Sequence, residues 1–237
     1  MRLPVTATSK YCKTSRYIIN MTLEFLSIGH THPIVSDINQ TLMSGTFVCL
    51  TGRNGTGKST LLKTLAGLIP PLSGQIRIGD TDIQTLTSRA LAQQIGLVLT
   101  QTPDLPNTTL RELVAYGRLP YASWLGKLNE NDYAVADRAI EQLGISPLAH
   151  RKINHLSDGE RQKAMIARAL AQGTKYLLLD EPSAFLDHES RLELMSLLVR
   201  LAHQEHKSIL LSTHDLELAH QYADALWQIK EGALSCI

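Results

Sequence analysis

A glycine-rich loop near residue 55 holds the side chains with the clearest chemical potential. It reads Gly52-Arg53-Asn54-Gly55-Thr56-Gly57-Lys58-Ser59-Thr60, between an apolar run at 47–50 and a leucine-rich stretch at 61–65. The glycines let successive N–H groups turn toward an anion, and a helix beginning near Ser59 adds its positive dipole end. Lys58 would reach the outer phosphates of a nucleotide, and the Ser59 hydroxyl would bind Mg²⁺. The order of strand, loop and helix predicts a nucleoside triphosphate site rather than a bare surface turn.

Two carboxylates follow a second apolar run. Residues 176–179 form an uninterrupted hydrophobic segment that ends in Asp180-Glu181. We expect Asp180 to hold Mg²⁺ through water, since Mg²⁺ keeps part of its hydration shell. Glu181 points elsewhere and is the candidate catalytic base that polarises an attacking water. An acidic strand end is commonly a helix cap or a turn, and only its combination with the phosphate loop favours catalysis.

Three further candidates depend on their context. Gln101 follows the apolar strand expected at 95–99, and His214 follows the one expected at 208–212. Ser157, ahead of an amphipathic stretch, forms with Glu160 the Ser-x-x-Glu pattern of a helix capping box. A single histidine after a strand is also more often structural. None of these residues indicates a function by itself.

The elements that would position these residues alternate between strand and helix. Apolar runs at 47–50, 95–99, 176–179, 208–212 and 225–229 are separated by helical patterns, which predicts a parallel sheet covered on both faces. Ligands of such sheets bind at the carboxyl ends of the strands, where the candidate residues fall. Short strands are also expected over 22–50. Between 102 and about 154 only helix signals interrupted by prolines occur, which predicts an inserted helical lobe.

Composition limits the class of protein. The chain has 237 residues, 43% of them hydrophobic, and a net charge of +1, which gives no sign of a nucleic-acid partner. Its cysteines, Cys12, Cys49 and Cys236, lack metal-ligand spacing and favour a reducing compartment. No apolar run is long enough to span a membrane. Residues 1–20 are basic and polar, and we predict a disordered extension there, with Met21 as an alternative initiator.

Taken together, the motifs resemble those of the ABC-transporter ATPases, in the order and spacing of that family and over residues 22–237. The matching segments are 52–60 (Walker A), Gln101 (Q-loop), 156–160 (signature), 176–182 (Walker B), 183–187 (D-loop) and 213–215 (H-loop). The resemblance implies a P-loop α/β fold of ABC type. That fold has a mostly parallel core, an antiparallel β subdomain and an inserted helical subdomain at about 102–172, within a domain spanning 21–237.

The resemblance also implies roles for the motif residues. ATP and Mg²⁺ would be the cofactors, with Gln101 joining Ser59 and Asp180 at the metal. His214 would contact the γ-phosphate and hold the attacking water with Glu181. Two copies would form a head-to-tail homodimer, in which Ser157 and the Gly159 backbone of one copy cover the nucleotide of the other.

Two places depart from the family pattern. The signature usually reads Leu-Ser-Gly-Gly-Gln, whereas Asp158 and Glu160 occupy its third and fifth positions here. We predict that the Asp158 side chain points away from the phosphates, toward Arg161 or Lys163. His30 stands where the family commonly has an aromatic residue against adenine, and it is either a weak base contact or a solvated turn residue.

The segment after residue 110 indicates a type of ABC protein. Residues 114–121, with Gly117-Arg118-Leu119-Pro120, and the stretches 128–132 and 139–145 resemble the helical lobe of importers for iron-siderophore complexes, haem and cobalamin. This implies a peripheral ATPase on the cytoplasmic face of the inner membrane, bound to permease subunits and indirectly to a substrate-binding protein. The alternative is a regulatory or scaffold ABC protein with little turnover. Another phosphate-loop kinase or GTPase would not need the signature or His214.

Overall fold

The computed structural model describes residues 19–100, 105 and 107–237. Its strands are β1 (Met21–Gly29), β2 (Pro33–Leu42), β3 (Phe47–Thr51), β4 (Ser73–Ile78), β5 (Thr81–Asp82), β6 (Ile95–Val98), β7 (Tyr176–Asp180), β8 (Ser208–Ser212), β9 (Ala225–Lys230) and β10 (Ala233–Cys236). Its α-helices are α1 (Lys58–Leu65), α2 (Ser88–Ala92), α3 (Leu110–Ala115), α4 (Glu130–Gln142), α5 (Asp158–Ala171), α6 (His188–Glu205) and α7 (Leu216–Tyr222). A 3-10 segment, η2 (Tyr116–Tyr121), follows α3 directly.

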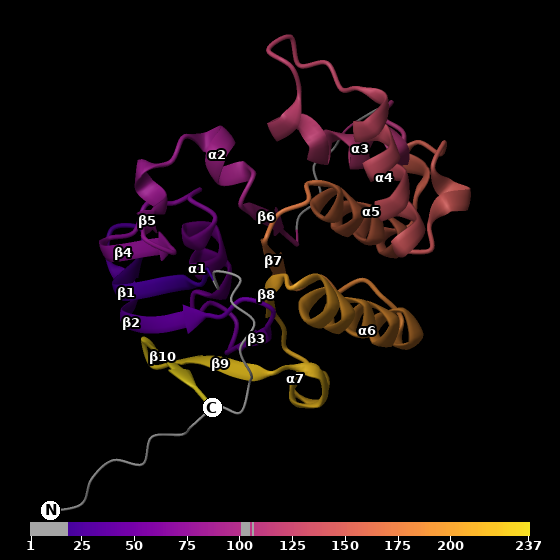
Figure 1. Cartoon of the computed structure of the whole chain (residues 1–237). Coiled ribbons are helices and arrows are strands. Elements are labelled where there is room, and N and C mark those ends of the chain that lie inside the picture. The colour runs from indigo at the N-terminus through magenta and orange to yellow at the C-terminus, as the bar shows by residue number, and fades with distance from the viewer. Residues whose placement is uncertain (1–18, 101–104, 106) are drawn as a thin grey trace, which may run out of the picture.

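The strands form two sheets. The central sheet has the order β10-β9-β3-β8-β7-β6, and all its pairings are parallel except that of β10 with β9. The second sheet, in the order β2-β1-β4-β5, is antiparallel. Figure 1 shows this second sheet on one side of the central strands, with α6 on the other side and α3, α4 and α5 gathered into a lobe above α6. The predicted α/β architecture is confirmed.

Side-chain alternation along the central strands builds two cores. In β3, Phe47 and Cys49 face the helices of the α3–α6 side, whereas Val48 and Leu50 face α1 and the antiparallel sheet. Side chains of β7 and β8 alternate in the same way, so both faces of the sheet are buried in a hydrophobic core. The carboxyl ends of β3, β7 and β8 are therefore held rigidly side by side. Those ends carry the predicted site residues.

The N-terminal boundary of the folded body lies slightly before Met21. Asn20 accepts a hydrogen bond from the Gly79 amide, and its side chain accepts one from the Ser44 amide. The Ile19 carbonyl accepts a hydrogen bond of 2.9 Å from the Tyr176 hydroxyl. Burial raises the pKa of this hydroxyl to about 12, so it remains a proton donor at neutral pH. The predicted disordered extension falls largely on residues 1–18, outside the described residues.

Candidate nucleotide site

The phosphate loop runs from the end of β3 into α1. Gly57 begins this helix in a left-handed conformation, with φ of 105°, and its carbonyl accepts the Leu61 amide. A Cβ atom on Gly57 would lie 3.0 Å from the Ile34 side chain of the β1–β2 hairpin. The loop is therefore packed against that hairpin. A larger residue at Gly57 would be disfavoured both by the left-handed backbone and by the close Ile34 side chain.

Lys58 is turned into the loop rather than toward solvent. Its side chain is only 5% exposed, and its Nζ donates to the carbonyl oxygens of Gly52, at 3.0 Å, and Arg53, at 3.3 Å. Burial lowers the pKa of Lys58, while the nearby carboxylates of Glu181 and Asp180 act in the opposite direction. A cation in this position is a suitable partner for phosphate oxygens.

Glu181 and His214 lie at the ends of neighbouring strands and contact each other. The Glu181 Oε1 atom is 2.6 Å from His214 Nε2 and 3.8 Å from Lys58 Nζ. A carboxylate only accepts hydrogen bonds, so the proton of this pair resides on His214 Nε2. The Lys58 Nζ atom, 3.4 Å from the same nitrogen, is then a close neighbour rather than a hydrogen-bond donor to it. The sequence predicted both residues for one site, and the structure brings them together.

The backbone at Glu181 is unusual. Its φ of 49° lies in the left-handed region, which is uncommon for a side chain of this kind and recurs at functional sites. The Glu181 amide donates to the Ser212 carbonyl at 3.2 Å and to the Ser212 hydroxyl at 3.0 Å. This fixed turn directs the carboxylate toward His214. A cavity of about 210 Å³ lies beside the pair, with Arg191 in its lining.

Ser212 is a site residue that sequence reasoning missed. Its buried hydroxyl donates to Asp180 Oδ1 at 2.7 Å. It therefore orients both neighbouring carboxylate residues, one through its own proton and one by accepting the Glu181 amide. A serine at the carboxyl end of a strand with an apolar centre, two residues before His214, was the available signal. The Thr100 hydroxyl, which donates to the Asp180 carbonyl, is a second support.

The side chains near the loop are suitable for Mg²⁺ held jointly with a nucleotide. Asp180 and Ser59 offer hard oxygen donors, and Ser59 is exposed at the start of α1. Among the described residues no group of three or more His, Cys, Asp or Glu could enclose a metal. Mg²⁺ characteristically takes few protein ligands and completes its shell with phosphate and water, so this sparse donor set fits it.

Ser157 and Gly159 begin α5, in the helical lobe. The Ser157 hydroxyl accepts the Glu160 amide, and the Glu160 carboxylate accepts the Ser157 amide at 2.8 Å, so the predicted capping box is confirmed. Asp158 is directed to Arg161, at 3.7 Å, as predicted, whereas Lys163 pairs with Glu193. The hydrogen bonds found for Ser157 in the described part of the chain stay within the start of α5. Its expected role toward a nucleotide therefore stays a prediction.

Two predicted contacts have different outcomes. Gln101 lies outside the described residues. His30 is exposed in the turn between β1 and β2. The same hairpin carries Ile34, whose side chain reaches the phosphate loop at Gly57. His30 is thus on an element that borders the loop, and its contact with a base stays a prediction.

Comparison with known proteins identifies the family. The family model described as ABC transporter matches residues 35–184, which include the phosphate loop, Ser157 and the Asp180-Glu181 pair. The chain belongs to the ABC transporter family. One relative, the achromobactin transport ATP-binding protein CbrD of Dickeya dadantii, is 41% identical over 201 residues, which are 84% of this chain and 74% of that protein.

Solved ABC structures have the same fold. A transporter of the metal-chelate type in an inward-facing conformation matches with a TM-score of 0.81 and 28% identity, over 92% of this chain and 83% of the other. A dimeric ATP-binding cassette bound to ADP and phosphate matches with a TM-score of 0.79 and 26% identity, over 91% of this chain and 96% of the other. No helix in the described part of this ABC chain has the length and hydrophobicity needed to cross a membrane.

Proposed function

We propose that this chain is the ATP-hydrolysing subunit of an importer for an iron chelate, haem or cobalamin. The observation that supports it best is the contact of Glu181 with His214, at 2.6 Å, beside Lys58 of the phosphate loop. This is the arrangement that an ATPase needs, because the base, the γ-phosphate contact and the cation converge. The similarity to an achromobactin transport protein and to a metal-chelate transporter supports the cargo class.

In the proposed reaction, the phosphate loop binds ATP and Lys58 exchanges its loop carbonyls for phosphate oxygens. Glu181 accepts a proton from the attacking water, while His214 contacts the γ-phosphate and holds that water together with Glu181. Mg²⁺, held by Ser59, Asp180 and Gln101, would supply charge neutralisation at the phosphates. Arg53, Asn54, Gly55, Thr56 and Thr60 contribute loop amides and side chains to the phosphates, and His30 contacts the base.

The proposed assembly is a homodimer on the cytoplasmic face of the membrane. Ser157 and Gly159 of one copy would close over the nucleotide of the other, through the exposed start of α5. The helical lobe, at about 102–172, would contact the permease, which in turn meets a substrate-binding protein. The dimeric state of the ADP-bound cassette supports the first of these contacts.

A Glu181→Gln substitution tests the catalytic assignment. It keeps the size of the side chain and removes the base, so we expect ATP turnover to fall by at least about 100-fold. ATP binding, followed by fluorescence of a labelled nucleotide, should persist. Glu217→Gln, at an exposed position of α7, is the matched control and should retain turnover.

The alternative function, a scaffold that binds ATP without turning it over, gives a different result in the same assay. Wild-type turnover would then be as low as that of Glu181→Gln, with or without the permease. A wild-type rate well above that of the variant contradicts the scaffold function. Copurification of a permease from the native membrane tests the importer assignment separately from catalysis.

A further inference from the structure

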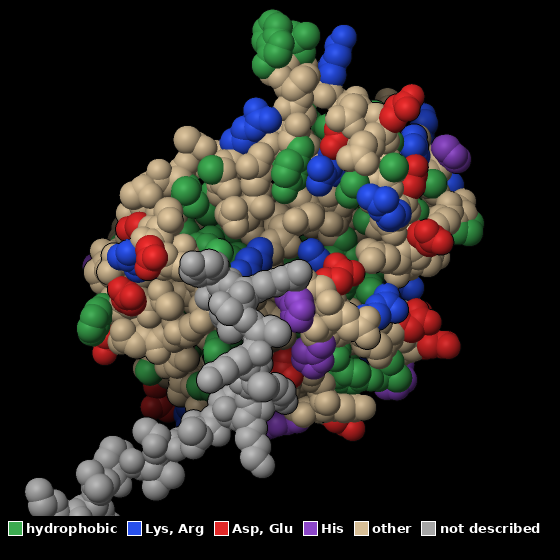
Figure 2. Space-filling view, in the orientation of Figure 1, with side chains coloured by type: hydrophobic (Ala, Val, Ile, Leu, Met, Phe, Trp, Pro, Cys, Tyr) green, Lys and Arg blue, Asp and Glu red, His purple; other side chains and the backbone are tan. Residues whose placement is uncertain are grey.

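The turn at residues 123–127 is the most exposed hydrophobic feature of the helical lobe. Trp124 is 89% exposed and Leu125 is 59% exposed, and Leu119, at the base of the turn, is 50% exposed. Figure 1 shows this segment as the outermost projection of the lobe, between η2 and α4. Figure 2 shows hydrophobic and basic side chains protruding together at that end of the molecule. We name residues 123–127 the lobe tip.

Hydrogen bonds fix the backbone of the lobe tip. The Gly126 amide donates to the Ser123 carbonyl at 2.9 Å, and the Lys127 amide donates to the Ser123 hydroxyl at 3.3 Å. A side chain of α2 braces its base, because Arg89 donates to the carbonyls of Pro120, at 2.9 Å, and Ala122, at 2.8 Å. These hydrogen bonds fix the backbone of the turn, which presents the exposed indole. Binding of a partner to the indole would therefore cost little entropy for ordering the backbone.

The chemistry of the lobe tip favours a lipid surface over a protein groove. The sequence from 116 to 128 contains no Asp or Glu, and Lys127 follows the apolar pair. A tryptophan with a lysine three residues later suits the boundary between lipid headgroups and acyl chains, where the indole is partly hydrated and the ammonium group pairs with phosphate. A protein partner would instead call for a broader apolar patch than Trp124, Leu125 and the neighbouring Leu119 provide.

We propose that the lobe tip contacts the headgroup region of an anionic phospholipid bilayer. Trp124 and Leu125 enter the interface, and Lys127 pairs with lipid phosphate. Two apolar side chains and one cation give only weak partitioning into a bilayer. The contact therefore adds to the permease association of the proposed function. It rests on that association to bring the lobe tip near the membrane.

Tryptophan emission from the full chain provides a direct test. The sequence has two tryptophans, and Trp227 is only 2% exposed, so changes in solvent contact report on Trp124. Adding vesicles that contain phosphatidylglycerol should shift the emission to shorter wavelength and protect it from a water-soluble quencher. Vesicles of phosphatidylcholine alone should give a smaller effect. The assay contains neither nucleotide nor permease, so its failure would leave the ATPase assignment standing.

Substitutions locate the contact. Trp124→Ser should lower the vesicle-bound fraction by about tenfold, measured by sedimentation at high lipid concentration. Lys127→Gln should lower it by about fivefold on anionic vesicles and leave it unchanged on neutral ones. Met43→Ser, which removes an apolar side chain of 53% exposure at the end of the antiparallel sheet, is the control and should bind as the wild type does.

Three results would overturn the proposal. The first is equal vesicle binding by the wild type and Trp124→Ser, or no binding by either. The second is emission that vesicles leave unchanged. The third is protection of Trp124 by detergent-solubilised permease but not by vesicles, which would assign the lobe tip to a protein partner.

Discussion

At the scale of single residues, the chemical tasks of the site are divided between neighbours on separate strands. Asp180 and Glu181 are adjacent in sequence, yet Ser212 of β8 bonds to the carboxylate of one and the amide of the other. His214, two residues after Ser212, contacts the carboxylate of Glu181. The left-handed backbone at Glu181 is the local strain that allows this division.

We expect that Asp158, in the signature segment, does not contribute to catalysis. Its carboxylate is 70% exposed and directed to Arg161, so removing it should change little at the phosphates. We predict that Asp158→Gly retains ATPase activity within about threefold of wild type, since exposed ion pairs contribute little. Steady-state turnover checks this, and a sharp loss of activity would show that the carboxylate takes part.

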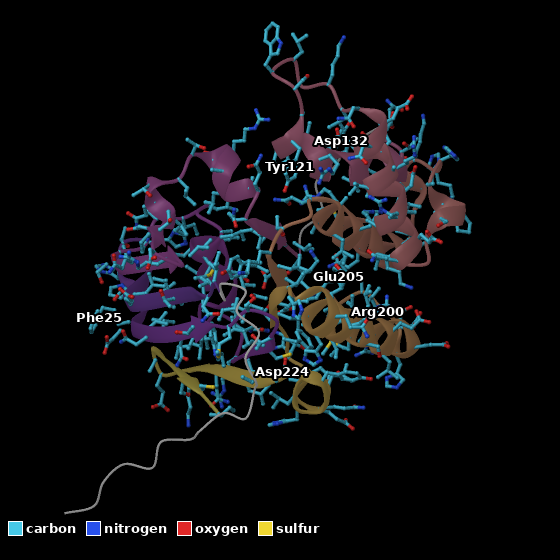
Figure 3. The ribbon with its side chains drawn as sticks, in the orientation of Figure 1. Phe25, Tyr121, Asp132, Arg200, Glu205 and Asp224 are labelled. Carbon is cyan, nitrogen blue, oxygen red and sulfur yellow. The ribbon has the colours of Figure 1, made fainter. Side chains whose placement is uncertain are left out.

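Phe25 has an unfavourable backbone conformation at an irregularity of β1, where its amide donates a hydrogen bond of 2.9 Å to the Asn39 side chain. It has φ of 51° within β1, its side chain is 72% exposed, and Figure 3 shows it at the outer margin of the molecule. Asparagine tolerates this backbone region better than phenylalanine. Phe25→Asn should therefore stabilise the protein by about 0.5–1 kcal/mol, visible as a higher melting temperature.

The control for Phe25 is alanine. Phe25→Ala removes the exposed ring but keeps the Cβ atom, and hence most of the strain, so its melting temperature should stay near that of the wild type. An equal rise for both variants would assign the effect to the exposed ring rather than to the backbone.

At the scale of elements, η2 packs closely against α4 and α5 within the helical lobe. A Cβ atom on Gly117 would lie 2.2 Å from the Arg168 carbonyl of α5, so only glycine allows this approach. Arg118 pairs with Asp132 of α4 at 3.1 Å, donates to the Ala171 carbonyl and lies over the Tyr121 ring at 4.0 Å. Figure 3 shows Tyr121 and Asp132 on adjoining elements of this lobe. The Gly-Arg-x-Pro segment thus has a structural reason for its composition.

Arg118→Leu tests this packing within the lobe. The pair is largely buried, with side-chain exposures of 13% and 4%, so the change leaves a buried carboxylate without its partner. We predict a loss of at least about 3 kcal/mol in the free energy of unfolding, measured with urea. Arg111→Leu breaks the more exposed pair with Asp137 and should cost less than about 1 kcal/mol. Equal losses would mean that burial of the pair is not the cause.

The strands were the most predictable elements. The runs at 176–179 and 208–212 became β7 and β8, because short apolar stretches are too brief for a helix and are typical of strands in a sheet covered on both faces. The helix α2 and the strand β10 were not predicted, since five and four residues are too short for a clear period. Likewise Ser212 acquires its role only when β7 and β8 pair, and a pairing between distant segments has no local signal.

At the scale of the whole molecule, the structure presents one half of the proposed site. The phosphate loop, Glu181 and His214 meet within one copy, whereas Ser157 begins a helix of the lobe and is exposed. A site completed by a second copy makes nucleotide binding and association one linked equilibrium.

Dimerisation should therefore depend on ATP. We predict that Glu181→Gln, which slows hydrolysis, elutes as a dimer in size-exclusion chromatography with Mg²⁺ and ATP, and as a monomer without nucleotide. Adding Ser157→Arg to this variant should abolish the dimer, because a bulky cation replaces the small cap at the start of α5. Ser235→Arg, on exposed β10, is the control. A dimer that persists with Ser157→Arg would contradict the head-to-tail arrangement.

The hydrogen bond from the Tyr176 hydroxyl to the Ile19 carbonyl has a consequence for shortened forms of this protein. A chain that starts at Met21 would lose that acceptor and the Asn20 contacts with Ser44 and Gly79. Tyr176 is the first residue of β7, the strand that ends at Asp180 directly before Glu181. Leaving its buried hydroxyl without a partner costs about 1–3 kcal/mol. Removing residues 1–20 would thus loosen the strand that supports the chemistry, far along the chain from the cut.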